Sequence, residues 1–112
     1  MVIKKSQTKI EKFGPGLIRD YPLPDNKIGV SYQEHSGRVP EKGWGMNTKC
    51  LELYYVIEGE AEIFIDDGHE KVEVGDLIVI NPNQKSYLVA KNLKLLTITS
   101  PNWHEGQYKE AA

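Results

Sequence analysis

The sequence predicts an all-β protein built from antiparallel strands that form a sandwich or barrel. Short runs rich in β-branched and aromatic residues recur about every ten residues from Ile28 onward, and turn residues separate them. No window sustains the apolar period of an amphipathic helix, so helix should be scarce. The chain has 112 residues, which favours one domain over residues 1–112.

The elements follow from where proline, glycine and apolar residues fall along the chain. Residues 1–27 are expected to form an N-terminal arm that crosses the sheet, because prolines and glycines interrupt regular structure there. The barrel should occupy residues 28–99, with turns at Glu58-Gly59 and at Asp67-Gly68, where glycine tolerates a positive φ. Its expected strands are residues 28–34, 49–57, 60–66, 69–74, 77–80, 85–90 and 93–99. The C-terminal tail, residues 100–112, should form one short helical turn or another crossing segment.

Two of the expected strands are apolar on both faces. In residues 49–57 and 77–80 neither set of alternating side chains is clearly polar. An antiparallel strand with one face in water normally alternates apolar and polar residues. The arm, the tail or a second copy of the chain should therefore cover the outer face, and we expect a homodimer.

Charge and cysteine content exclude several classes of partner. Fourteen basic and sixteen acidic residues give a net charge of −2, so no basic excess favours nucleic acid or an anionic membrane surface. Cys50 is the single cysteine and cannot form an intramolecular disulfide. The start of the chain lacks the apolar stretch of a secretory signal, so a cytoplasmic protein is expected.

Two segments together resemble the conserved motifs of the cupin superfamily. Cupins carry a first motif with a glycine, two histidines one residue apart, a glutamate and a later glycine, and a second motif with Gly-Asp, an apolar strand, a proline turn and a third histidine. Here six residues separate Glu52 from Gly59, the same spacing as in the first motif, and Gly75-Asp76 opens an apolar strand that ends at Asn81-Pro82. The resemblance implies a cupin-type double-stranded β-helix, that is, a jelly-roll barrel. The tail from Pro101 to Lys109 is also similar to that of a group of small, single-domain cupins.

The sequence departs from the family at the metal ligands. In the cupin register the three histidine positions fall on Met46, Thr48 and Ser86. A thioether and two hydroxyls are poor replacements for imidazoles, and Glu52 alone does not hold a first-row metal. No metal and no other cofactor is therefore expected, unless a shifted register brings other side chains inward, such as those of Asn47 or Tyr87.

The remaining aromatic and imidazole side chains have plainer interpretations. His35, His69 and His104 are not gathered by any metal-binding spacing, and each is expected on the surface. Trp44 and Trp103 could form a lid over a pocket, but attaching the chain ends to the barrel is the simpler role.

The same register predicts which side chains line the barrel cavity. The expected ligand-binding residues are Met46, Thr48, Glu52, Tyr54, Ser86 and Leu88. A mixed polar and apolar lining suits a small organic ligand. If Glu52 is buried its pKa should rise, and Glu52 and Tyr54 then become candidate catalytic residues; alternatively, Glu52 is a structural carboxyl held by hydrogen bonds. Cys50 is expected to be a small buried hydrophobe rather than a nucleophile.

Three functions remain open at this stage, since one fold serves many functions. The first is a metal-free module that binds a small polar or sugar-like molecule in the barrel. The second is a metal-free isomerase or epimerase in which Glu52 and Tyr54 exchange protons with a substrate. The third is a metal-dependent oxygenase or isomerase, which would need ligands recruited from elsewhere in the chain.

Overall fold

The computed structural model describes residues 1–112, except for the side chain of Phe13. Almost all of the described chain is antiparallel β-structure, which confirms the predicted fold class. The strands are β1 (Lys9–Phe13), β2 (Gly16–Tyr21), β3 (Gly29–Val39), β4 (Trp44–Asn47), β5 (Leu51–Ile65), β6 (Gly68–Glu73), β7 (Leu77–Ile80), β8 (Lys85–Ser100) and β9 (Tyr108–Ala111). Two short 3₁₀ turns complete the described elements, η1 (Lys5–Gln7) and η2 (Glu105–Gln107). Neither turn has the length and apolar character that a membrane-crossing helix requires.

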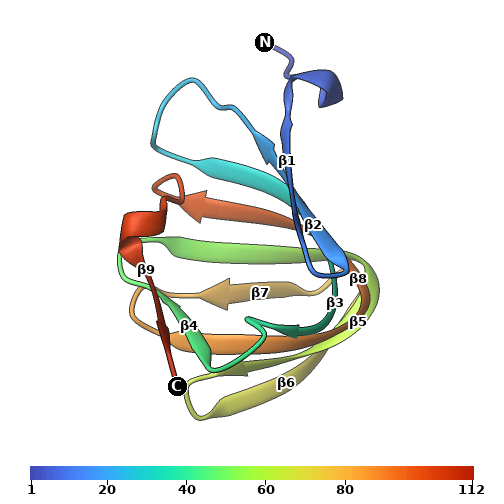
Figure 1. Cartoon of the computed structure of the whole chain (residues 1–112), viewed down its shortest axis with the longest axis vertical. Coiled ribbons are helices and arrows are strands. Elements are labelled where there is room, and N and C mark those ends of the chain that lie inside the picture. Colours follow the sequence, from blue (N-terminus) through green and yellow to red (C-terminus); the bar gives the residue numbers. More distant parts are fainter.

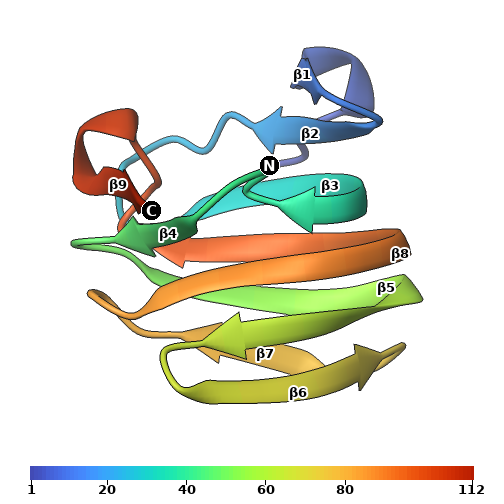
Figure 2. The same ribbon diagram turned by 60° about the horizontal axis from the view of Figure 1, so that its bottom comes forward.

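The strands form one sheet that curls into a barrel around β5 and β8 (Figure 1). The sheet runs in the order β1-β2-β3-β8-β4-β9, and β5 pairs with β8 along most of its length and also with β6 and β7. Figure 2 shows β3, β8 and β5 stacked one below the other, with β6 and β7 beneath them. In the same view β4, β9 and η2 lie together at one end of the barrel, so the C-terminal tail meets the strand that precedes β5.

The predicted turn at Glu58-Gly59 is wrong, because β5 continues through it as one strand. The register between β5 and β8 shifts around Glu58, which marks a bulge rather than a chain reversal. Gly59 has a φ of 83°, and a side chain there would collide with the backbone carbonyl of Asn92. The bulge changes the phase of the strand: the buried side chain of Val56 sits at an even position, whereas Ala61 and Ile63 are buried at odd positions.

The predicted break between residues 85–90 and 93–99 is also a bend within a single strand, β8. Asn92 sits at this bend with a φ of 48°. The hairpin between β5 and β6 is present, but its two turn residues are Asp66 and Asp67 rather than Asp67 and Gly68. The positive φ falls on Asp66, which tolerates it as a turn residue, and Gly68 already pairs with Ile65.

The ends of the chain contain more sheet than the sequence predicted. Residues 9–21 form the hairpin β1–β2, which extends the sheet beyond β3 through pairs such as Arg19 with Tyr32. Both strands escape disruption because Pro15 lies in the tight turn between them. The tail contains both expected alternatives, a helical turn (η2) and a further strand (β9) that pairs with β4.

Apolar side chains fill much of the barrel interior. The buried apolar cluster comprises Val56, Ala61, Ile63, Val72, Ile78, Ile80, Leu88, Ala90, Leu93 and Leu95. On the outside of β5 and β7, apolar side chains stay exposed in the single chain: Leu77 keeps 56% of its surface in water and Tyr55 46%. These two residues pair across the strands, and Val79 and Ile57 extend the patch. The homodimer remains a prediction, now with a defined surface.

Candidate functional site

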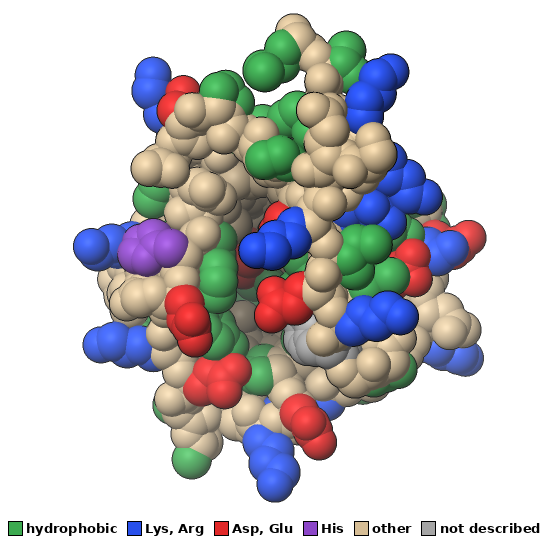
Figure 3. Space-filling model, turned by 45° about the horizontal axis from the view of Figure 1, so that its top comes forward, with side chains coloured by type: hydrophobic (Ala, Val, Ile, Leu, Met, Phe, Trp, Pro, Cys, Tyr) green, Lys and Arg blue, Asp and Glu red, His purple; other side chains and the backbone are tan. Residues whose placement is uncertain are grey.

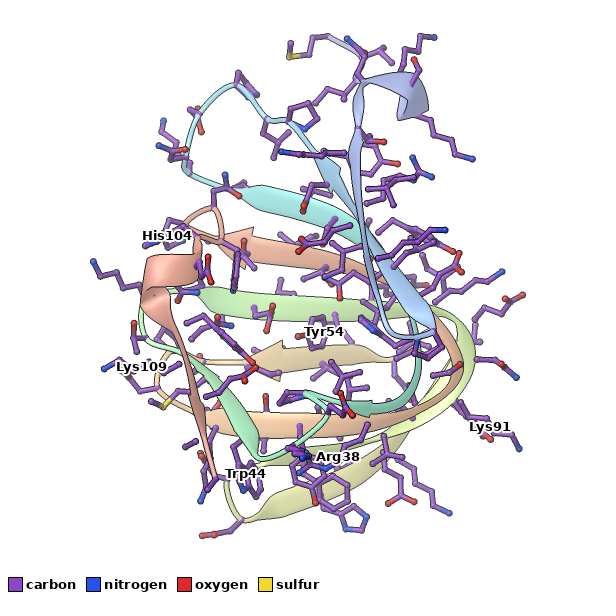
Figure 4. All side chains as sticks on the ribbon, viewed as in Figure 1. Arg38, Trp44, Tyr54, Lys91, His104 and Lys109 are labelled. Atoms are coloured by element: carbon purple, nitrogen blue, oxygen red, sulfur yellow. The ribbon has the colours of Figure 1, made fainter. Side chains whose placement is uncertain are left out.

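Strand β5 carries the two central side chains of the site. Glu52 pairs with Thr99 of β8, and Tyr54 pairs with Thr97, so both point to the interior face on which those threonines are buried. Figure 4 labels Tyr54 in the middle of the barrel, whereas Lys91 lies far out at its edge. The alternation of β5 therefore carries a carboxyl and a phenol into the barrel.

These side chains border a cavity of about 70 Å³. A recess is also visible in the space-filling view, and hydrophobic, acidic and basic side chains lie around it (Figure 3). The cavity is lined by Val39, Pro40, Gly45, Met46, Asn47, Glu52, Tyr54, Ile63, Ile80, Gln84, Ser86, Tyr87, Leu88 and Tyr108. A cavity needs roughly 10–15 Å³ to hold one water molecule, so this one has room for about five water-sized groups.

One oxygen of Glu52 receives two hydrogen bonds. The hydroxyl of Tyr54 donates to Oε1 over 2.8 Å, and Nδ2 of Asn47 donates to the same oxygen over 3.1 Å. None of the hydrogen bonds among the described residues reaches Oε2. Among the described residues, Oγ1 of Thr97 is the one fully buried side-chain oxygen without a hydrogen-bond partner, so Oε2 of Glu52 is not fully buried, and Glu52 borders the cavity.

Burial raises the pKa of the Glu52 carboxyl above its ordinary value, and the hydrogen bonds from Tyr54 and Asn47 act in the opposite direction. Burial, with the Glu52 charge beside it, raises the pKa of Tyr54 well above that of a free tyrosine. Tyr54 therefore stays protonated and serves as a donor. Burial and its hydrogen bond to Glu110 likewise raise the pKa of Tyr108.

The C-terminal tail reaches this site through Asn47. Oδ1 of Asn47 accepts a hydrogen bond from Nε1 of Trp103 at 3.0 Å and another from Nε2 of Gln107 at 2.8 Å. Gln107 is only 1% exposed, and its Oε1 accepts from the backbone N–H groups of Lys49 and Cys50. A continuous hydrogen-bond path thus leads from η2 to the carboxyl of Glu52.

The structure brings most of the predicted lining residues together. The ones that border the cavity are Met46, Glu52, Tyr54, Ser86 and Leu88. Thr48 does not, which corrects the prediction: its hydroxyl donates to the backbone carbonyl of Gln107 over 2.6 Å. Strand β4 ends at Asn47 and β5 begins at Leu51, so the alternation assumed across residues 46–52 is broken.

Asn47, which the sequence offered only through a shifted register, takes an inward position instead. The roles of Gln107 and Tyr108 were missed. Their spacing in the tail carries no motif, and only the pairing of β9 with β4 brings them to the barrel. Trp103 does attach the tail to the barrel, as its simpler interpretation proposed.

The other predicted polar residues lie outside the cavity. His35 is only 5% exposed, contrary to the expected surface position, and its Nε2 lies 2.7 Å from Oε1 of Gln33. Burial lowers the pKa of His35. His69 is exposed beside Glu62, and His104 is also exposed. Cys50 is fully buried, and burial raises the pKa of its thiol, as its role as a hydrophobe requires.

The cavity lining does not fit the metal centre that the cupin resemblance implies. Glu52 is its one carboxylate, and no imidazole of the described chain borders it. No group of three or more His, Cys, Asp or Glu side chains in the described residues could hold a metal ion. The donor set that first-row metals prefer in proteins is thus not assembled here.

Comparisons with known proteins identify the fold. No family model and no curated relative matches the chain. Among solved structures, Streptomyces PAC13 with uridine, in a variant form, aligns with a TM-score of 0.88 and 14% identity over 99% of this chain and 89% of that one. KdgF from Halomonas sp. gives a TM-score of 0.76 and 13% identity over 92% and 96%. Bacillus subtilis oxalate decarboxylase gives 0.79 and 17% over 95% of this chain and 30% of that one. These neighbours share one barrel fold with this chain.

Proposed function

This chain has the cupin fold, and we propose that its barrel binds a small, neutral, oxygen-bearing molecule without the help of a metal. The observation that carries the proposal is the arrangement at Glu52. Both donors, Tyr54 and Asn47, engage Oε1, whereas Oε2 receives no hydrogen bond from the described residues and Glu52 borders the cavity, so we take Oε2 as the oxygen open to a ligand. Because burial raises its pKa, the Glu52 carboxyl stays protonated up to a higher pH than an exposed carboxyl does. In that form it can donate a hydrogen bond to an oxygen acceptor on a ligand.

Charge supports a neutral ligand. The residues that line the cavity include no lysine, arginine or histidine, so a carboxylate or phosphate would find no counter-ion there. Figure 4 labels Lys91 and Lys109 at the two sides of the barrel, whereas Arg38 lies near Trp44 with its guanidinium 3.9 Å from the centre of the Tyr87 ring, outside the lining. An anionic ligand would also meet repulsion from Glu52 once that carboxyl ionises.

Size and polarity narrow the ligand further. A volume of about 70 Å³ suits a molecule, or one end of a molecule, of roughly five or six non-hydrogen atoms. Ile63, Ile80 and Leu88 offer apolar walls, and the Ser86 hydroxyl adds a polar contact. A short polyol, a hydroxyketone or the sugar end of a larger molecule has this character. PAC13 is described with uridine, a neutral sugar-bearing compound, which is consistent with this class.

A metal-free enzyme that moves protons, such as an isomerase or epimerase, is the second candidate. The 2.8 Å hydrogen bond between Tyr54 and Glu52 favours it, because a proton can pass along such a contact. A related structure is that of Pac13, a nucleoside dehydratase. Tyr54 stays protonated, however, and Glu52 is the one carboxylate in the lining, so a separate base for the return step is missing.

The test is isothermal titration calorimetry with three probes of matched size and different charge. These are dihydroxyacetone (neutral), glycerate (anionic) and 2-amino-1,3-propanediol (cationic). At mildly acidic pH we expect dihydroxyacetone to bind better than either charged probe. The substitution Ser86→Phe should abolish this binding because the ring fills the cavity, whereas Ser36→Phe, on the exposed part of β3, should not.

Equal binding to the two serine variants would place the ligand elsewhere, and a preference for glycerate would refute the neutral class. The enzyme alternative is tested with the same probe: dihydroxyacetone is incubated with the protein in D₂O. Deuterium entering its carbon positions faster than with Glu52→Gln would favour proton transfer over simple binding.

A further inference from the structure

We infer that the C-terminal tail is part of the binding site: Gln107 and Trp103 fix the side-chain amide of Asn47, which confines the proton of Glu52 to the oxygen that faces the ligand. The inference deepens the proposed function and rests on it. Gln107 and Trp103 do not touch the ligand in this account, because neither borders the cavity. They are positioning residues that act through Asn47.

The orientation of Gln107 is set by the backbone. Its Oε1 lies 3.1 Å from the N–H group of Lys49 and 3.2 Å from that of Cys50, and both of these groups only donate. The oxygen of the Gln107 amide must therefore face them, which leaves Nε2 as the donor toward Asn47. The side chain is only 1% exposed, so no water replaces these partners.

The orientation of Asn47 follows from that of Gln107. Nε2 of Gln107 at 2.8 Å and Nε1 of Trp103 at 3.0 Å both point at the same atom, and an indole N–H only donates. That atom must be the amide oxygen, Oδ1. The other end of the amide, Nδ2, then donates to Oε1 of Glu52. Turning the Asn47 amide over would set two donors against an NH₂ group.

In the neutral Glu52 carboxyl, the two oxygens differ in whether they can carry the proton. Oε1 faces an NH₂ group that cannot accept a hydrogen bond, and it also accepts from the hydroxyl of Tyr54. A proton on Oε1 could be accepted only by the Tyr54 hydroxyl, which would then give up the hydrogen bond that it donates to Glu52, while the Asn47 NH₂ group would still face a protonated oxygen. The neutral carboxyl therefore carries its proton on Oε2, toward the cavity, and selects ligands that present a lone pair there, such as a carbonyl or ether oxygen.

The test uses the side-chain amide signals of Asn47 in ¹⁵N–¹H NMR spectra, recorded without ligand through a pH titration. In the parent protein we expect these signals to shift as Glu52 ionises, and the shift should vanish in Glu52→Gln. In Gln107→Glu the new carboxylate still accepts from Lys49 and Cys50, but it offers an acceptor to Asn47. The Asn47 amide should then turn, so its pH-linked shift should fall several-fold and dihydroxyacetone should bind about tenfold more weakly, a loss of roughly 1.4 kcal/mol.

Two controls separate orientation from charge and from folding. Gln33→Glu adds the same charge outside the cavity lining, where the Gln33 amide bonds Ser31 and His35 instead of Asn47, so the titration of Asn47 should persist. If Gln107→Glu does not fold, Trp103→Phe decides the question. Loss of its N–H should speed solvent exchange of the Asn47 amide protons several-fold, whereas Trp44→Phe should not.

An Asn47 amide that titrates in Gln107→Glu as it does in the parent would overturn the inference, as would unchanged exchange in Trp103→Phe. Because the NMR readout needs no ligand, it also separates the two proposals. If the titration is as expected but no probe binds, the proposed function fails alone. If dihydroxyacetone binds but Gln107→Glu alters neither the titration nor the affinity, the role of the tail fails alone.

Discussion

Replacing Glu52 with glutamine should stabilise the protein at alkaline pH and leave its stability at acidic pH nearly unchanged. The substitution keeps the shape of the side chain, and the amide oxygen can still accept hydrogen bonds from Tyr54 and Asn47. The amide nitrogen takes the place of the protonated Oε2. Glutamine therefore imitates the neutral form of Glu52 at every pH.

The size of the effect follows from proton linkage. Burial raises the pKa of folded Glu52 above the ordinary value of 4.5, so unfolding releases a proton at any pH between the two values. The Glu52 contribution is fully present below about pH 4.5 and is lost as the pH rises through the folded pKa. Within that window the parent should lose about 1.4 kcal/mol of stability per pH unit relative to Glu52→Gln. For a domain of this length that is a difference of about 5 °C in melting temperature per pH unit.

The assay is thermal unfolding of both proteins across a series of buffers, followed by circular dichroism. Taking the difference between the proteins cancels the other titrating groups, including His35, whose pKa is lowered by burial. We expect the two melting temperatures to coincide near pH 4.5 and to separate progressively above it. A difference that stays constant across the whole range would show that Glu52 ionises as freely as an exposed glutamate, and would refute the argument.

Three further predictions concern other parts of the molecule. The exposed apolar patch on β5 and β7 should pair two copies of the chain, so light scattering should give twice the chain mass for the parent and the single mass for Leu77→Glu; a monomeric parent would remove the argument. Gly59→Ala should lower the free energy of unfolding by more than about 2 kcal/mol, because it adds a collision with the Asn92 carbonyl to the strain of a positive φ. Gly75→Ala is the control: its φ is similar but the space around it is open, so the loss should be about 1 kcal/mol. Equal losses of the two variants in urea unfolding would contradict this. Cys50 is buried and burial raises its thiol pKa, so iodoacetamide should label it only after unfolding, and rapid labelling of the native protein would be the contrary result.

Much of the barrel could be predicted because its signals are local. The apolar run of β7 and the Asp-rich hairpin before β6 are visible in a few adjacent residues. The inward positions of Glu52 and Tyr54 followed from alternation along a single strand. These features depend on backbone geometry that every strand shares, so no knowledge of distant contacts was needed.

The errors arose where the outcome depended on long-range pairing. Glu58-Gly59 has the composition of a turn, but pairing with β8 on both sides of it makes it a bulge. Thr48 was misplaced because its partner, Gln107, comes from the far end of the chain. Such contacts leave no spacing for a sequence pattern to detect.

The bulge at Gly59 determines which side chains of the first half of β5 face the barrel interior. Side chains before the bulge face inward at even positions, and side chains after it face inward at odd positions. Pairing with β6 and β8 holds the second half of β5 in place, so deleting one residue at the bulge would turn the first half over. Leu53 and Tyr55 would then occupy the barrel, and Glu52 and Tyr54 would face solvent. A single deletion at the bulge is therefore expected to replace Glu52 and Tyr54 by Leu53 and Tyr55 on the interior face of β5.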